Sequence, residues 1–117
     1  MQRLISSLTR TTFAKDAYLW REGDNADLIY FIESGLVTIF RSGPQGDTAV
    51  LLMGFPGDLI GEPAVLASAE FRSVDAQAVE ETTCLLLQKE TALDFFDRHP
   101  VLLRRIIAWM RLRAPFD

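Results

Sequence analysis

The chain has 117 residues, of which 49% are hydrophobic, and a net charge of -4. That length suits one core and one domain better than two, and the negative field argues against nucleic acid as a direct partner. A single cysteine, Cys84, excludes an intrachain disulfide and suits a reducing cytoplasm, and no apolar run is long enough to span a bilayer. We therefore expect a cytoplasmic protein that does not insert into membranes.

The first elements in chain order are a short N-terminal helix at 4–8 and then a series of strands. Glycines recur about every ten residues from Gly23 to Gly57, a turn rhythm typical of all-β sandwiches and barrels. Between and after them lie runs rich in β-branched, aromatic and other apolar residues, which predict strands at 28–32, 36–40, 48–53, 73–79 and 83–88. SGPQGD at 42–47 has the composition of a hairpin turn. Cys84 fits a small buried side chain in the last strand.

The pattern becomes helical after residue 88. Apolar positions in ETALDFFDRH predict one helix, and His99 before Pro100 ends it. Pro100 suits the first position of a second helix. Its apolar stripe consists of Leu102, Leu103, Ile106, Ile107 and Met110. The prediction is a mainly β fold, an antiparallel β-roll of the jelly-roll-like, double-stranded β-helix type, with flanking short helices. The single domain would span 1–117, with the roll at about 10–88, two C-terminal helices at about 89–114 and no DNA-binding domain.

The stretch IGEPAVLASAEFRSVDA at 60–76 carries a candidate anion site. Pro63 is well placed to begin a short helix, whose free amides, including those of Ala64 and Val65, would face an anion. Arg72 adds a planar, permanently charged fork that suits two phosphate oxygens, and Ser73 adds a hydroxyl and an amide.

Gly61 and Glu62 form a bend at the start of the same stretch. The Glu62 carboxylate only accepts hydrogen bonds, so it suits sugar hydroxyls and not the anion itself. The alternative is an internal ion pair between Glu62 and Arg72 that closes the loop. The chemistry of these residues alone leaves both interpretations open.

The stretch resembles the phosphate-binding cassette of the cyclic-nucleotide-binding domain family. That cassette reads Phe-Gly-Glu, a small apolar helix, and Arg followed by Ser, Thr or Ala; this chain has Ile60-Gly61-Glu62, PAVL and Arg72-Ser73. LWREGDNADLIYFIESGLVTIF at 19–40 is similar to the family's hairpin framework, and the resemblance continues through TCLLLQ into the final helices. It implies that Arg72, Ser73 and the Ala64 amide hold the cyclic phosphate, and that Gly61 and Glu62 hold the ribose 2'-hydroxyl.

The chain departs from that cassette at several positions. Ile60 replaces an aromatic residue, Pro63 replaces one with an amide, and Val74-Asp75 stand where a small and an uncharged residue are usual. If the Asp75 side chain turned toward Arg72, it would compete with the phosphate. Strand alternation puts Asp75 on the face opposite to Val74 without deciding which face that is.

The resemblance implies a non-catalytic sensor that binds cAMP or cGMP, with the base left open. The alternative is the same fold without ligand, serving as an interaction or dimerisation module. His99 is the only histidine, too few for a cupin metal centre or haem, and no nucleophile and base lie at a persuasive spacing, so we expect no catalytic residues, metal or cofactor. The final helix either packs on the roll or supplies a homodimer contact through Trp109 or Met110; a fused effector domain is the further partner to expect.

Overall fold

The computed structural model describes residues 8–61, 69–101 and 104. Eight strands and one bounded helix lie within these ranges. They are β1 (Thr9–Phe13), β2 (Tyr18–Trp20), β3 (Leu28–Ser34), β4 (Val37–Ser42), β5 (Thr48–Gly54), β6 (Leu59–Ile60), β7 (Asp75–Ala78), β8 (Thr82–Gln88) and α3 (Lys89–Arg98).

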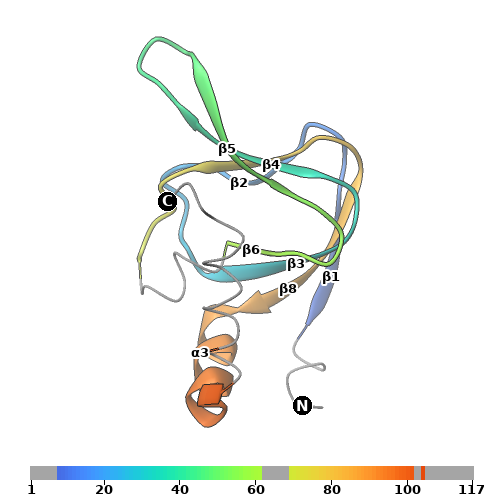
Figure 1. Ribbon diagram of the computed structural model, residues 1–117, viewed down its shortest axis with the longest axis vertical. Helices are drawn as coiled ribbons and strands as arrows, with labels where there is room; N and C mark the ends of the chain where they lie inside the picture. Colours follow the sequence, from blue (N-terminus) through green and yellow to red (C-terminus); the bar gives the residue numbers. More distant parts are fainter. Residues whose placement is uncertain (1–7, 62–68, 102–103, 105–117) are drawn as a thin grey trace.

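The strands form two four-stranded sheets, of order β1-β8-β3-β6 and β2-β7-β4-β5. All the strand pairs within both sheets are antiparallel. Figure 1 shows the two sheets as layers, with α3 beyond β8 and the β4–β5 hairpin projecting from the opposite end. The predicted antiparallel β-roll is therefore confirmed.

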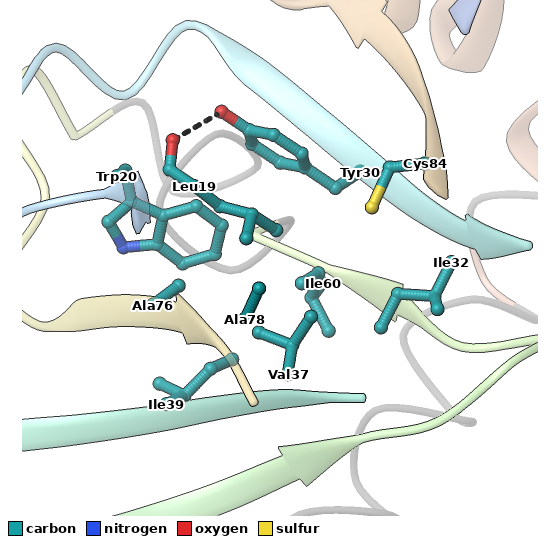
Figure 2. Close-up of a cluster of buried hydrophobic side chains, with 10 residues drawn as sticks. All are labelled: Leu19, Trp20, Tyr30, Ile32, Val37, Ile39, Ile60, Ala76, Ala78 and Cys84. Carbon is teal, nitrogen blue, oxygen red and sulfur yellow. Dashed lines mark hydrogen bonds between the residues drawn. The ribbon is translucent and has the colours of Figure 1, made fainter. Parts of the chain in front are cut away.

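The core fills the space between the sheets because side chains alternate along each strand. Tyr30 and Ile32 of β3 face inward, and the intervening Phe31 faces outward with 37% of its surface exposed. Figure 2 shows this cluster, in which the two sheets contribute opposite walls. Its buried members are Leu19, Trp20, Tyr30, Ile32, Val37, Ile39, Ile60, Ala76, Ala78 and Cys84.

Helix α3 covers part of the outer face of the first sheet. Its Ala92 and Phe96 pack against Ile29 of β3, whose side chain points away from the main core. The helix begins directly after β8, and the Lys89 amide donates to the Asp27 carbonyl at 2.9 Å. His99 is its C-cap, with φ -132°, and Pro100 and Val101 are helical again. The sequence prediction of a helix break before Pro100 is confirmed.

The predicted strands are found with shifted ends. The run at 73–79 is a strand only over Asp75–Ala78, because Ser73 and Val74 form a bend. The turn at 42–47 is confirmed, closed by the Gly43 amide on the Asp47 carbonyl at 2.7 Å. Strands β1, β2 and β6 were not predicted; β1 is largely polar, and β2 and β6 have only three and two residues. The predicted helix at 4–8 and the stripe from Leu102 onward fall almost entirely outside the described residues.

Candidate functional site

The turn at 23–26, which is far from Arg72 along the chain, fixes the backbone of Arg72. The segment before β7 runs antiparallel to the turn at 23–26, with a bridge between Asn25 and Phe71. The Arg72 amide donates to the Asp24 carbonyl at 2.8 Å, and the Gly23 amide donates to the Arg72 carbonyl at 2.9 Å. The Gly-Asp turn of the predicted framework thus holds the residue that the sequence assigned to the phosphate.

The Arg72 side chain is buried, with 4% of its surface exposed. Its Nη1 donates to the Gly61 carbonyl at 2.7 Å, and its Nη2 donates to the Leu28 carbonyl. The guanidinium carbon Cζ lies 4.2 Å from the centroid of the Trp20 ring. An arginine presents a flat, forked cation, so these partners fix both its position and its plane. The structure thereby brings Gly61 and Arg72 into direct contact across 11 positions of sequence.

Glycine suits position 61 better than a residue with a side chain. Its φ of +82° lies in the left-handed region. A Cβ at this position would lie 3.0 Å from Arg72 Nη1 and 3.2 Å from two carbons of the Trp20 ring. The arginine and the indole therefore fill the space that a side chain would need.

Trp20 is a member of the site that the sequence analysis did not single out. It is buried, its Nε1–H donates to the Val74 carbonyl at 2.9 Å, and its ring packs 5.2 Å from that of Tyr30. The Tyr30 hydroxyl donates to the Leu19 carbonyl at 3.1 Å, the dashed contact of Figure 2. The sequence signal that could have identified Trp20 is an aromatic residue just before the Gly23-Asp24 turn, at the end of an alternating Tyr-Leu-Trp run.

Burial sets the electrostatics around this aromatic pair. It raises the pKa of the Tyr30 hydroxyl to about 12, while the nearby Arg72 charge acts in the opposite direction. The Trp20 ring thus lies against the cation, and the Tyr30 ring packs against Trp20. Such a low-dielectric wall strengthens the interaction of the guanidinium with any charge beside it.

The structure fixes the face of Asp75 that the sequence left open. Its Oδ1 accepts the Glu22 amide at 2.7 Å, so this carboxylate ties β7 to the turn after β2. Ser73 directly follows Arg72 and is exposed. Glu62 and Ala64, predicted to hold the sugar and the phosphate, lie outside the described residues, as does the predicted start of a helix at Pro63.

The other two candidate chemical groups, Cys84 and His99, are packed among neighbouring side chains. Cys84 is fully buried in β8, and burial raises the pKa of its thiol to about 11. His99 lies at the end of α3 with its ring 4.4 Å from that of Phe95. In the part of the chain that the structure describes, no three His, Cys, Asp or Glu residues are grouped as metal ligands. Among the same residues, no helix combines the length and the apolar character that crossing a membrane requires.

The comparisons with known proteins agree with this geometry. The family profile of the cyclic nucleotide-binding domain matches residues 10–99. The cyclic AMP receptor protein of Thermus thermophilus is 31% identical over 109 residues, which are 93% of this chain and 50% of that protein. The anaerobic regulatory protein of Bacillus subtilis is 25% identical over 111 residues, 94% of this chain and 47% of that protein.

The solved structures show the same likeness. The crystal structure of the Thermus thermophilus catabolite activator protein superposes with a TM-score of 0.82 at 29% identity, covering 96% of this chain and 52% of that one. The chain spans about half the length of the curated relatives that it matches. The family profile covers residues 10–99 and so includes the strands β2, β3 and β6 and the turn at 23–26, which position Gly61 and Arg72. The chain belongs to the cyclic nucleotide-binding domain family.

Proposed function

We propose that this chain is a non-catalytic, cytoplasmic regulatory module whose residues 61–73 bind a cyclic nucleotide, either cAMP or cGMP. The observation that carries the proposal is the buried Arg72 guanidinium, which lies over the Trp20 ring and is bonded to the carbonyl of Gly61. A buried, rigid, forked cation is suited to a phosphate diester with two free oxygens. The relatives named for cyclic AMP reception and catabolite activation support the same ligand class.

The remaining groups take roles around that cation. Ser73 is exposed next to Arg72 and would add a hydroxyl and an amide to the phosphate, together with the Ala64 amide. Glu62, a carboxylate adjacent to Gly61, would accept the ribose 2'-hydroxyl. We assign no base preference. Because the chain spans half of its relatives, a fused effector domain or a homodimer reached through the C-terminal helix belongs to the same proposal.

One observation favours the second candidate, a ligand-free interaction module. Two donors of the Arg72 fork already have backbone acceptors, the carbonyls of Gly61 and Leu28. If those bonds persist, Arg72 is a structural cross-link between β3 and the end of β6. The fold would then present surfaces to a protein partner without a small-molecule signal.

Calorimetric titration of the 117-residue chain with cAMP and with cGMP separates the two candidates. We expect saturable heat with at least one cyclic nucleotide, and a loss of affinity of about a hundredfold or more in Arg72→Lys, which keeps the charge but not the fork. Arg10→Lys is the matched control, because Arg10 has a bidentate carboxylate partner, Glu33, on the exposed face of β1. Linear 5'-AMP tests the need for a cyclic phosphate. No heat from the wild-type chain at high micromolar nucleotide would favour the ligand-free module.

A further inference from the structure

We infer that Trp20 is a positioning residue, which sets the affinity of the site by holding Arg72 in its binding orientation. The inference rests on the proposed function, and it concerns a residue that no part of the phosphate-binding cassette contains. The guanidinium carbon lies 4.2 Å from the centroid of the indole, within the range in which the negative ring face attracts a cation. Trp20 lies on β2, whereas Gly61 and Arg72 flank the cassette.

Trp20 is itself anchored on three sides. Its Nε1–H is bonded to the Val74 carbonyl, two residues after Arg72, so the indole is tied to the segment that carries the cation. Its ring packs against Tyr30, whose hydroxyl is bonded to the Leu19 carbonyl of β2. Its outer carbons lie close to the position that a Cβ of Gly61 would occupy. The indole is therefore a rigid platform and not a mobile lid.

Burial gives the platform its effect on binding. Arg72 and Trp20 are 4% and 5% exposed, so little water screens the attraction between the cation and the ring. A freely rotating arginine would lose side-chain entropy each time it met an anion, whereas one already held by the ring and by two backbone carbonyls has lost it on folding. Reducing the negative potential of the indole face should therefore lower the affinity for the nucleotide even when the fold is unchanged.

Fluorinated tryptophans test this directly, because ring fluorines withdraw charge from the indole face and change its size little. The chain has two tryptophans, so Trp109→Phe serves as the reference protein and carries the label at Trp20 alone. Across a series from unfluorinated to multiply fluorinated Trp20, we expect affinity for the bound cyclic nucleotide to fall steadily, by roughly three- to thirtyfold in total. The melting temperature of the unliganded protein should change little. Affinity that stays flat across the series would overturn the positioning role.

Two ordinary substitutions provide a second measurement. Trp20→Phe and Trp20→Leu both lose the bond to Val74, but only phenylalanine keeps an aromatic face. We expect Trp20→Phe to bind several-fold more tightly than Trp20→Leu at matched stability, and equal affinities would contradict the inference. The wild-type chain is titrated first with cAMP and cGMP. If it binds neither, the proposed function fails and the ligand role of Trp20 fails with it. If it binds but the fluorinated series is flat, or if Trp20→Phe and Trp20→Leu made in the wild-type chain bind equally, only the role of Trp20 is wrong.

Discussion

The guanidinium carbon of Arg72 lies 4.2 Å from the centre of the Trp20 ring, and the Arg72 Nη1 donates to the Gly61 carbonyl at 2.7 Å. The cation thus contacts an aromatic face and, through one of its N–H donors, the backbone of a glycine. Trp20 belongs to β2, Gly61 follows β6 and Arg72 precedes β7, so the arrangement exists only when both sheets have formed.

Arg72 should contribute to stability as well as to binding. Arg72→Ala removes the donors to the Gly61 and Leu28 carbonyls, and each buried acceptor left without its donor costs about 1–3 kcal/mol. We expect a fall of about 2–4 kcal/mol in the free energy of unfolding, measured by urea titration. Arg10→Ala, on the exposed face of β1, should change it much less. Equal effects of the two substitutions would show that the buried bonds of Arg72 are weak.

Gly61→Ala tests the close contact with Arg72 and Trp20. Gly46 has a nearly identical φ, +83° against +82°, but nothing within 4 Å of its Cβ position, so Gly46→Ala is a matched control for backbone strain. We expect Gly46→Ala to cost about 1–2 kcal/mol and Gly61→Ala about 1–3 kcal/mol more. Urea titration measures both. A nucleotide affinity that falls equally in the two variants would contradict a local role for Gly61.

Asp75 should be a structural acceptor and not a competitor of the phosphate. Asp75→Asn keeps an oxygen for the Glu22 amide but removes the charge. If the carboxylate does not compete for Arg72, the change should raise nucleotide affinity by less than about threefold, a distant charge effect that added salt reduces. Competition predicts a much larger gain. Asp75→Ala, which also removes the acceptor, should lower the melting temperature more than Asp75→Asn.

Alkaline pH should destabilise the fold through two buried acids. Burial raises the pKa of Cys84 from 9.0 to about 11 and that of Tyr30 from 10.0 to about 12. The unfolded chain therefore releases these protons at lower pH than the folded one, and stability declines as pH rises from 9 toward 12. Chemical unfolding at a series of pH values measures the decline. Tyr30→Phe should make it shallower above pH 10, and an unchanged profile would show that Tyr30 does not contribute.

Strong local signals made much of the fold predictable. The glycine spacing and the β-branched runs predicted the strands at 28–32, 36–40, 48–53 and 83–88, each within two residues of the observed ends. Pro100 marked the break after α3 because the residue before a proline avoids helical geometry. The strand Thr9–Phe13 escaped prediction because it is largely polar and pairs with β8, about seventy residues further along the chain.

The sequence by itself determined two of the chemical groups of the candidate site. Arg72 and Gly61 were identifiable because a forked cation and a residue free to adopt positive φ have distinct chemistry. Only the tertiary structure decided that Trp20 lies under the cation and that Asp75 faces the Glu22 amide. Both relationships depend on how β2 pairs with β7, and a pairing between strands so distant in sequence is set by the packing of the whole core and not by local propensity.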